Sequence, residues 1–275
     1  MLLYGKGIRD EIKSRVSQLA KTDKMCLAVL RVGEDAASES YLRGMRRFAD
    51  ETGVHLEVIH LAASVSEGQV LRTIDDLNRD DEITGVMIQT PLPAHLEAMQ
   101  LVNALRFDKD VEGVHNYNLG RLVSREAGVR PSTPKAILSL LKAYQVPLEG
   151  QKVVVIGRST IVGTPLALMM TNENATVTLC HSRTRNLPEE TRAGDILVVA
   201  VGKMDFVTPE MVREDMVVID AGIHYGPDGK MRGDVHEETR HLVRMASAVP
   251  GGVGVVTVAE LFDNLTILKQ QKTAP

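Results

Sequence analysis

The amino-acid sequence predicts an α/β fold, because short apolar runs alternate with longer helical stretches along the chain. That alternation is typical of sheets whose strands are mostly parallel. The length of 275 residues, at about 150 residues per domain, predicts about two domains. The 44% apolar and 25% charged fractions are ordinary for a globular chain. These values exclude a disordered chain, a collagen and a coiled coil.

The expected elements follow from where the apolar runs lie. In the first half of the chain we expect strands over residues 25–32, 55–61 and 85–89, with helices at about 8–19, 38–52 and 66–79. In the second half we expect strands over residues 152–156, 176–180, 195–200 and 216–220. No internal repeat interrupts this order, so the chain is interpreted as two α/β lobes.

The boundary between the lobes is expected after a helix over residues 133–144. The following segment contains Pro147 and Gly150 and leads into the most apolar strand of the chain. We therefore expect an N-terminal domain over 1–144 and a C-terminal domain over 145–256, with a cleft between them. A helix from Thr257 to about Lys269 opens the last segment, 257–275, which we expect to pack on the N-terminal domain.

Charge, cysteines and hydropathy exclude several classes of protein. The 32 Lys+Arg against 36 Asp+Glu give a net charge of −4 without a basic block, so no nucleic-acid partner is expected. Cys26 and Cys180 lie far apart in apolar runs, which predicts buried thiols and no metal site. The apolar runs are far shorter than the ~20 residues of a membrane span, and the N-terminus lacks a signal-peptide pattern. We therefore expect a cytoplasmic protein without a membrane partner.

A glycine-rich loop joins the predicted strand 152–156 to a helix. It runs from Gly157 through Arg158 and Ser159 to Gly163. A strand, a glycine turn and a helix start together form an anion site, because free amides point at the ligand and the helix dipole favours negative charge. Ser159 holds the second glycine position of G-x-G-x-x-G, and the last glycine comes one residue late. The loop predicts a dinucleotide-binding, Rossmann-type domain, with a plain tight turn as the alternative.

The end of the next strand bears on which dinucleotide binds. About 20 residues past the glycine loop, an NAD site normally carries Asp or Glu for the ribose 2′-hydroxyl. Here the strand is followed by His181, Ser182 and Arg183, without a carboxylate. A hydroxyl and a guanidinium can bind a 2′-phosphate, so we predict NADP, with Arg158 and Arg183 as phosphate partners. The alternative is that Arg183 and Arg185 are solvated loop charges.

Two further strands end in small residues. Gly202 follows the predicted strand 195–200, and Gly222 follows the predicted strand 216–220. An open α/β sheet binds its ligand at the carboxyl ends of its strands. Both glycines are therefore expected to line the nucleotide, although either one alone is more often a turn residue.

The first lobe contains three polar positions that are singly unremarkable. Tyr41 lies in the predicted helix 38–52, Gln89 ends a strand, and Asp110 belongs to a short charged segment that continues to Gly113. Taken one at a time, Tyr41 reads as a core residue, Gln89 as a strand-end cap and Asp110 as a turn cap.

Taken in order, however, the motifs resemble one known family. The motifs are Gly5-Lys6, the segments 32–41 and 85–93, Lys109-Asp110-Val111-Glu112-Gly113, and the segments 130–134, 157–165 and 250–254. Their order and spacing from Gly5 to Asn264 are similar to those of the FolD family, the methylenetetrahydrofolate dehydrogenase/cyclohydrolases. The resemblance implies an N-terminal catalytic and folate-binding α/β domain, a C-terminal NADP-binding domain, and a homodimer joined through the nucleotide domains.

The resemblance also implies a reaction. NADP oxidises 5,10-methylenetetrahydrofolate to 5,10-methenyltetrahydrofolate, and water then opens the methenyl compound to 10-formyltetrahydrofolate. Carried over by position, Tyr41 resembles the aromatic residue that stacks on the folate, and Gln89 the amide that positions the general base. Asp110, Glu112 and the run Pro250-Gly251-Gly252 are expected at the folate, and Val253 at the nicotinamide. The nucleotide contacts would be Gly157, Arg158, Ser159, Gly163, His181, Ser182, Arg183, Gly202 and Gly222.

Several positions depart from the family's pattern. Four residues after Tyr41 the family has a lysine as its general acid/base, and this chain has Met45. The second carboxylate of the family's Lys-Asp-Val-Asp-Gly is Glu112 here, one methylene longer. Further departures are Ser132 and Ala136 in the segment after Arg130, and Val255-Val256 after the last glycine motif.

These departures predict unequal effects on the two activities. Hydride transfer needs alignment with the cofactor and moves no protein proton. Water attack needs a base and ring opening needs an acid, and loss of such a group costs ~10²–10⁴-fold. Arg46 does not deprotonate in proteins, and His115 is expected in a turn, so neither is an expected substitute. We therefore expect a dehydrogenase whose cyclohydrolase activity is weak or lost.

Three other interpretations stay open. One is a fully bifunctional dehydrogenase/cyclohydrolase. Another is an NADP-dependent dehydrogenase that acts on a different pterin-like substrate, given Glu112 and Val255-Val256. The third is a non-catalytic relative that binds folate or nucleotide.

Overall fold

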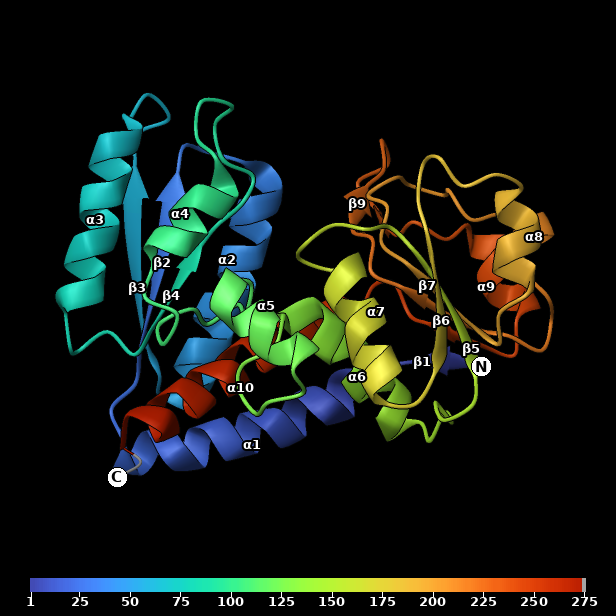
Figure 1. Cartoon of the computed structure of the whole chain (residues 1–275), viewed down its shortest axis with the longest axis horizontal. Helices are drawn as coiled ribbons and strands as arrows, with labels where there is room; N and C mark the ends of the chain where they lie inside the picture. The colour runs from blue at the N-terminus through green and yellow to red at the C-terminus, as the bar shows by residue number, and fades with distance from the viewer. Residues whose placement is uncertain (274–275) are drawn as a thin grey trace. The chain divides into compact units, whose positions relative to one another are not determined.

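The computed structural model describes residues 1–273, except for the side chains of residues 36, 37 and 273 (Figure 1). The chain divides into two compact units. The six-stranded unit comprises Met1–Arg9 and Thr133–Thr257, and the three-stranded unit comprises Asp10–Ser132 and Val258–Pro275. Residues 274 and 275, the end of the expected return segment, lie outside the described residues.

These units differ from the expected domain limits at both ends of the first lobe. Strand β1 (Leu2–Leu3) pairs in parallel with β11 (Met245–Ser247), so the N-terminus belongs to the six-stranded unit. Helix α6 (Ser132–Ala143) also falls almost wholly in that unit, whereas the expected limit was residue 144. A strand of two residues is too short to be recognised from hydropathy, although its backbone hydrogen bonds fix its place in the sheet.

The three-stranded unit contains a parallel sheet in the order β3-β2-β4. Its strands are β2 (Cys26–Val32), β3 (His55–Leu61) and β4 (Gly85–Ile88). Alternate residues of β2, from Cys26 to Val32, face a core that helices α3 (Glu67–Arg79) and α4 (Ala98–Ala104) complete. In Figure 1, α3 lies alongside β3. Strand β2 is the central strand, with β3 on one side and β4 on the other. The carboxyl end of β2 is therefore the switch point of this sheet.

Local signals set the limits of the helices in this unit. Helix α2 (Ala36–Thr52) begins after Asp35, whose carboxylate accepts the Ser38 amide at 2.8 Å. It ends at Gly53, which adopts φ 77° as left-handed C-caps do. Helix α3 begins with a capping box formed by Ser66 and Gln69. The remaining helices are α1 (Lys6–Thr22), α5 (Asn116–Val123) and α10 (Val253–Thr273), and α1 and α10 each contribute residues to both units.

The C-terminal part of α10 packs within the three-stranded unit. Phe262 lies with its ring centroid 4.9 Å from that of Phe48 in α2. Asn264, which is fully buried, donates its side-chain amide to the carbonyls of Val111 at 2.9 Å and Arg130 at 2.7 Å. These contacts fasten two loops of the unit to one helix.

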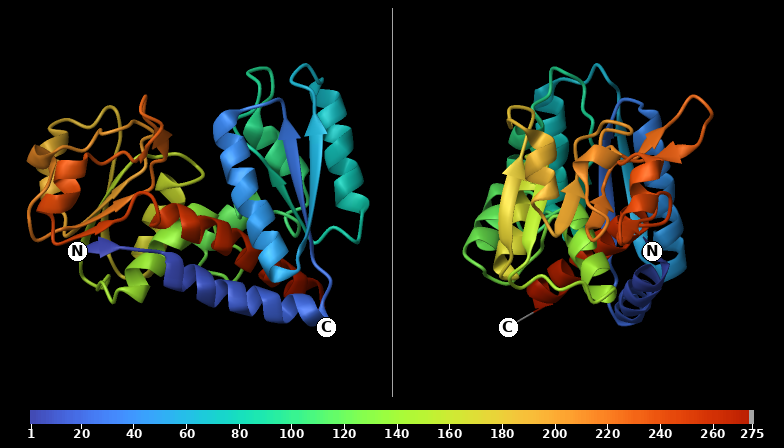
Figure 2. Two further views of the ribbon diagram at one scale, coloured as in Figure 1. Left: turned by 180° about the vertical axis from the view of Figure 1, so that it is seen from behind. Right: turned by 90° about the vertical axis from the view of Figure 1, so that its right-hand side faces the viewer.

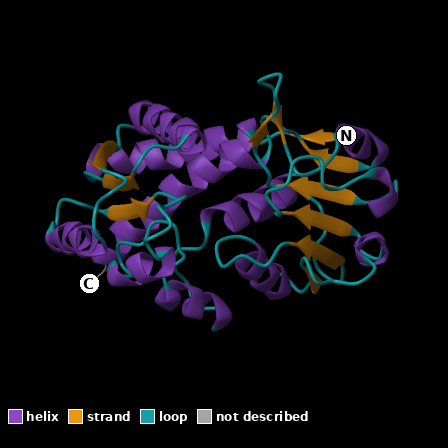
Figure 3. Cartoon of the chain, turned by 90° about the horizontal axis from the view of Figure 1, so that it is seen from above, coloured by secondary structure: helices purple, strands orange, loops and turns teal. Residues whose placement is uncertain are grey.

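The six-stranded sheet is parallel throughout, in the order β1-β11-β8-β7-β5-β6 (Figure 3). Figure 2 shows the N-terminal strand at the edge of this sheet. Its other strands are β5 (Lys152–Ile156), β6 (Thr176–Cys180), β7 (Ile196–Val199) and β8 (Val217–Asp220). The helices of this unit are α7 (Gly163–Asn172), α8 (Leu187–Arg192), α9 (Glu237–Leu242) and the 3₁₀ turn η1 (Pro209–Met211), and a short antiparallel pair comprises β9 (His224–Tyr225) and β10 (Met231–Arg232).

The expected parallel α/β fold is therefore confirmed, and the longer elements lie where the hydrophobic pattern predicts them. Helix α10 begins at Val253, earlier than the expected Thr257, so Val253 and Gly254 are helical. The elements that the pattern missed are short: α4, α5, α8, α9, η1, β1 and β9 to β11. Cys26 and Cys180 are both buried free thiols, as expected. Within the described residues, no helix combines the length and the hydropathy that a membrane crossing requires.

The Asn264 bridge predicts a stability effect. Substitution Asn264→Ala leaves the Val111 and Arg130 carbonyls without this donor in the interior, which costs about 1–3 kcal/mol per buried group. We expect a loss of about 2–4 kcal/mol in the free energy of unfolding, measured by urea denaturation with circular dichroism. Gln271→Ala, an exposed amide on the same helix, is the control and should change stability by less than about 0.5 kcal/mol. Equal midpoints for the two variants would contradict this role of Asn264.

Candidate active site and nucleotide site

A charged segment lies beside β4 in the three-stranded unit and extends its backbone pairing. The Val86 amide donates to the Lys109 carbonyl at 2.7 Å, and Val86 forms an isolated parallel bridge with Asp110. In this register Glu112 is level with Ile88, the last residue of β4. The carboxyl end of β4 and Glu112 therefore lie at the same edge of the sheet.

The start of α2 is tied to that edge by Gln89 and Ser38. Gln89 is 3% exposed and donates its Nε2 to the Ser38 carbonyl at 2.7 Å. The Ser38 hydroxyl donates to the Thr90 carbonyl at 3.2 Å. The other amide atom of Gln89, Oε1, is buried and accepts no hydrogen bond from the described residues. A buried acceptor without a donor is costly, so this oxygen is suited to an N–H or O–H group of a bound molecule.

Tyr41, one turn along α2 from Ser38, faces the same region as Glu112. Burial raises the pKa of the Tyr41 hydroxyl, and the negative charge of Glu112 raises it further. Burial also raises the pKa of Glu112, to about 8, with a smaller contribution from Asp110. Both side chains are only partly buried. Two titratable groups thus lie close together where a substrate can reach them.

Met45, at the position where the resemblance implies a lysine, lies one turn beyond Tyr41. Its side chain is 0% exposed and belongs to the buried face of α2 with Leu42 and Phe48. A thioether in that environment neither exchanges a proton nor reaches solvent. Met45 is therefore a core residue of this unit.

Asp110 holds the turn that presents Glu112. It is 2% exposed, and its two oxygens accept the Gly113 amide at 3.0 Å, the His115 amide at 2.8 Å and the Asn118 side chain at 2.8 Å. Gly113 has φ 72°, and a Cβ there would lie 2.5 Å from the carbonyl carbon of Arg130. These contacts agree with the interpretation of Asp110 as a turn cap, and its contact with a substrate stays a prediction.

The other ionisable groups of this segment are turned to structural partners. Lys109 is 0% exposed and donates its Nζ to the carbonyls of Leu77 at 2.6 Å and Asp80 at 2.5 Å, at the end of α3. His115 caps α5, its Nδ1 accepting the Tyr117 amide at 2.9 Å. Arg130 donates its guanidinium to the carbonyls of Val129 and Glu126.

The glycine-rich loop of the six-stranded unit joins β5 to the start of α7. Gly157 has φ 116°, and a Cβ there would lie 2.2 Å from the Ala200 carbonyl oxygen at the end of β7. A Cβ on Gly163 would lie 1.8 Å from the Gly157 carbonyl oxygen. The Ser159 hydroxyl accepts the Val162 amide at 3.2 Å and shapes the turn. Because β6 lies on one side of β5 and β7 on the other, this loop occupies the switch point of the sheet, where α/β proteins bind nucleotides.

The end of β6 lies next to that loop and leaves its basic side chains exposed. The His181 Nδ1 accepts the Arg183 amide at 3.2 Å, and the Gly157 amide donates to the Cys180 carbonyl at 2.9 Å. Ser182, Arg183 and Arg158 are exposed. The loop after β6 therefore offers hydroxyl and guanidinium donors beside the glycine turn, which fits a phosphate-bearing ribose.

Two buried aspartates shape the loops at the ends of β7 and β8, and neither is among the site residues predicted from the sequence. Asp234 is 0% exposed and accepts the amides of Val201 at 2.7 Å, Gly202 at 3.0 Å and Lys203 at 2.9 Å, and it also contacts His224. Asp220 accepts the Gly222 amide at 2.9 Å and pairs with Arg240 at 2.8 Å. Asp220 could have been found from the sequence, because it is an aspartate at the end of an apolar strand. Asp234 follows a hairpin, and no sequence pattern indicates its role.

The turn 250–253 belongs to the six-stranded unit. Gly251 has φ 101° and accepts the Gly5 amide on its carbonyl at 2.8 Å. A Cβ on Gly252 would lie 2.4 Å from the Ala248 carbonyl oxygen. The expected contacts of Pro250, Gly251 and Gly252 with folate, and of Val253 with the nicotinamide, stay predictions.

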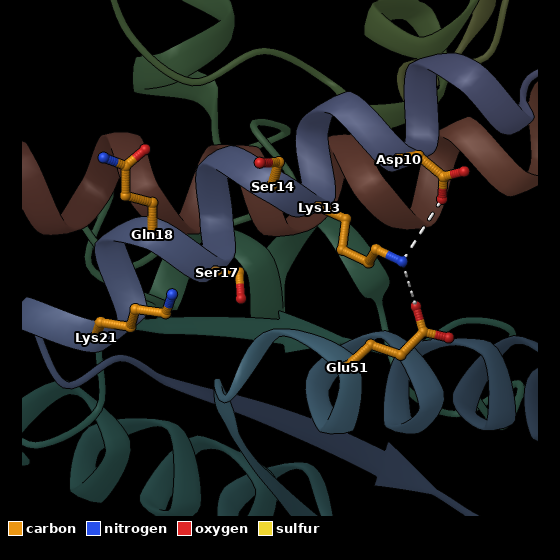
Figure 4. A pocket seen from close by; sticks show the side chains of 7 residues that line it. All are labelled: Asp10, Lys13, Ser14, Ser17, Gln18, Lys21 and Glu51. Atoms are coloured by element: carbon orange, nitrogen blue, oxygen red, sulfur yellow. Dashed lines mark ion pairs between the residues drawn. The ribbon is translucent and has the colours of Figure 1, made fainter.

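Two other features of the three-stranded unit lie apart from this site. Cys26, His55 and Glu57 each place one ligand atom within 4.8 Å of the others on one face of the sheet. Burial and the charges of Glu57, Asp80 and Glu82 raise the pKa of the Cys26 thiol to about 11, which disfavours the thiolate that metals bind. A polar hollow of about 490 Å³ is lined by residues of α1 and by Glu51 of α2. Figure 4 shows Lys13 in this hollow, paired with Asp10 and Glu51.

Comparison with known proteins matches two family models to successive parts of the chain. The family described as tetrahydrofolate dehydrogenase/cyclohydrolase, catalytic domain, matches residues 3–112. The corresponding NAD(P)-binding domain matches residues 131–273.

Individual relatives match over nearly their whole length. Bifunctional protein FolD 2 of Syntrophomonas wolfei is 64% identical over 271 residues, covering 98% of this chain and 100% of its own length. The crystal structure of the bifunctional FolD enzyme of Campylobacter jejuni has a TM-score of 0.93 at 36% identity, covering 98% of this chain and 99% of that chain. The Trypanosoma brucei methylenetetrahydrofolate dehydrogenase-cyclohydrolase, solved with NADP and an inhibitor, has a TM-score of 0.93 at 30% identity, covering 100% of this chain and 99% of that chain.

The resemblance inferred from the motifs is thereby confirmed. Tyr41, Gln89 and Glu112 lie within the matched catalytic domain, and the glycine loop lies within the matched nucleotide domain. This chain belongs to the tetrahydrofolate dehydrogenase/cyclohydrolase family, FolD, with a catalytic domain and an NAD(P)-binding domain.

Proposed function

We propose that this chain is bifunctional: it oxidises 5,10-methylenetetrahydrofolate with NADP, and it hydrolyses the resulting methenyl compound to 10-formyltetrahydrofolate. One observation carries the proposal for the chemistry. Tyr41, Gln89 and Glu112 converge at one sheet edge of the matched catalytic domain, and they offer an aromatic ring, an orphan acceptor and a carboxyl group. The bifunctional relatives support both activities.

Our expectation of weak or lost cyclohydrolase activity rested on Met45, and the comparisons do not support it. The fully bifunctional alternative fits the 64% identical relative better. The absence of a lysine at position 45 therefore leaves open which group handles the proton, and it is not a reason to discard hydrolysis.

The nucleotide-binding residues fit a dinucleotide. Gly157 and Gly163 allow the tight turn of this loop, because a Cβ at either position would clash with a backbone carbonyl, and α7 starts at that loop with the positive end of its dipole. Bound NADP supplies the hydride acceptor. The chain's own contribution to this step is orientation, through the Tyr41 ring and the Gln89 amide on the substrate side.

The preference for NADP over NAD is supported by the exposed Ser182, Arg183 and Arg158 and by the lack of a carboxylate after β6. A homodimer joined through the nucleotide domains is part of the proposal because the resemblance implies it. The expected cytoplasmic location stays a prediction.

The two activities are tested separately on the purified chain. With 5,10-methylenetetrahydrofolate and NADP, we expect saturable formation of NADPH. With the methenyl compound alone, we expect hydrolysis well above the spontaneous rate, because the second reaction needs no cofactor. Both are followed by absorbance at a fixed pH, with heat-inactivated protein as the blank. Saturable NADPH formation without enzymic hydrolysis would restore the dehydrogenase-only interpretation, and neither reaction would favour another substrate or a binding protein.

Cofactor choice depends on Arg183 in this proposal. A guanidinium–phosphate hydrogen bond contributes about 1.5–3 kcal/mol, so Arg183→Ala should raise the KM for NADP by about 10–100-fold and leave the KM for NAD nearly unchanged. The measurement is initial rates with each cofactor at saturating folate.

Arg185→Ala is the matched control, since Arg185 is an exposed arginine of the same loop. It should change neither KM appreciably. Equal increases for NADP and NAD in Arg183→Ala, or a larger effect of Arg185→Ala, would argue that Arg183 does not bind the 2′-phosphate.

A further inference from the structure

We infer that Glu112 is the catalytic acid/base of the hydrolytic reaction in this chain, at the place in the mechanism for which Met45 provides no group. The inference rests on the proposed cyclohydrolase activity and adds to it the residue that carries the proton.

The geometry first limits which side chains can act. Near the carboxyl end of β4, few of the described ionisable side chains lack a structural partner. Lys109 is 0% exposed and bonded to two carbonyls of α3, and the two oxygens of Asp110 accept three hydrogen bonds of the turn. His115 caps α5. Glu112 and Tyr41 remain, and both are partly accessible.

The placement of Glu112 is rigid. The bridge between Val86 and Asp110 sets its register against β4. Gly113 turns the chain immediately after it, with the left-handed φ that a side chain would oppose, and Asn264 holds the Val111 carbonyl before it. The backbone on both sides of Glu112 is thus fixed, while none of the described residues donates a hydrogen bond to its carboxyl group.

The electrostatic surroundings suit proton transfer near neutral pH. The groups that face Glu112 are Asp110 on its own segment and the Tyr41 hydroxyl on α2, and the guanidinium of nearby Arg130 is bonded within its own loop. Burial and Asp110 raise the pKa of Glu112 to about 8. A group whose pKa lies near the working pH can both accept and donate a proton within one catalytic cycle. Tyr41, whose pKa is raised, keeps its proton and serves only as a donor.

The chemistry then balances through one carboxyl group. As water forms a bond to the methenyl carbon, the Glu112 carboxylate takes a proton from that water, and the cationic substrate becomes a neutral carbinolamine. Glu112 next gives the proton to N5 while the bond between N5 and the carbon breaks. The carbinol hydroxyl releases its proton to solvent as the formyl C=O forms on N10. The net change is addition of one water and release of one proton, with no oxidant or reductant.

The principal test is Glu112→Gln, assayed on the methenyl compound with the spontaneous rate subtracted. We expect kcat for hydrolysis to fall about 10²-fold or more. The dehydrogenase moves no protein proton, so the ratio of hydrolysis to dehydrogenation should fall at least about ten-fold. A merely structural residue would lower both activities together.

The pH profile provides a readout that a structural role would not move. Because the carboxylate form takes the proton, wild-type kcat for hydrolysis should rise with pH and level off above about 8. Glu112→Asp should retain this rise of kcat with pH (the titrating limb of the profile), and Glu112→Gln should lose it. Glu97→Gln, an exposed carboxylate before α4, is the matched control and should reproduce the wild-type profile.

Thermal unfolding checks the environment of Glu112 without any substrate. A carboxyl group whose pKa rises from 4.5 to about 8 on folding costs no stability below about pH 4.5, an increasing amount between 4.5 and 8, and a constant amount above 8. The melting temperature of Glu112→Gln should therefore equal that of the wild type near pH 4.5 and exceed it by a growing margin up to pH 8.

The outcomes separate the two proposals. If the wild type dehydrogenates but does not hydrolyse, the bifunctional proposal is wrong and Glu112 has no such role. If the wild type hydrolyses and Glu112→Gln keeps both its rate and its pH limb, the function stands and the assignment of Glu112 is overturned. A proportional loss of both activities with an unchanged limb also overturns it.

Discussion

Buried aspartates hold the loops at which the parallel strands of this protein end. A parallel strand leaves its last amides unpaired where the chain turns away, and such groups are costly in the interior. Asp110 binds the turn that follows the segment bridged to β4, whereas Asp220 and Asp234 bind the loops after β8 and β7. Glu112, Gly202 and Gly222, which are predicted site residues, all lie on or beside backbone that these carboxylates hold.

The contrast among the carboxylates separates structure from chemistry. Burial raises the pKa of both Asp110 and Asp220, and amide hydrogen bonds partly offset that effect. Such bonds favour the ionised form, and they occupy lone pairs that a reacting proton would need. Glu112 has burial without these donors, so its carboxyl group keeps free lone pairs, and burial raises its pKa to about 8. In this protein, the number of hydrogen bonds that a buried carboxylate accepts therefore separates the structural aspartates from the proposed acid/base.

Most of the fold could be predicted from the sequence, because strands such as 152–156 and 196–199 are apolar enough to be recognised alone. The site could be predicted only in outline. The glycine loop could be predicted because its tight backbone turn requires glycines that lie close together in the sequence. The role of Asp234 depends on a hairpin that returns it to the end of β7, and the raised pKa of Glu112 depends on what surrounds it. Neither property belongs to any stretch of neighbouring residues.

Position 45 illustrates the same limit for mechanism. The family resemblance implies an acid/base at one place on α2, and Met45 on the buried face of that helix cannot fulfil that role. A proton carrier, however, needs only to reach the reacting atoms, and it can come from any element that ends at that edge. The bonds of Gln89 and Ser38 join the start of α2 to the end of β4, and the bridge between Val86 and Asp110 brings the segment of Glu112 beside them. Because backbone contacts fix this convergence, the proton-handling group can change its element while the aromatic ring and the amide keep theirs.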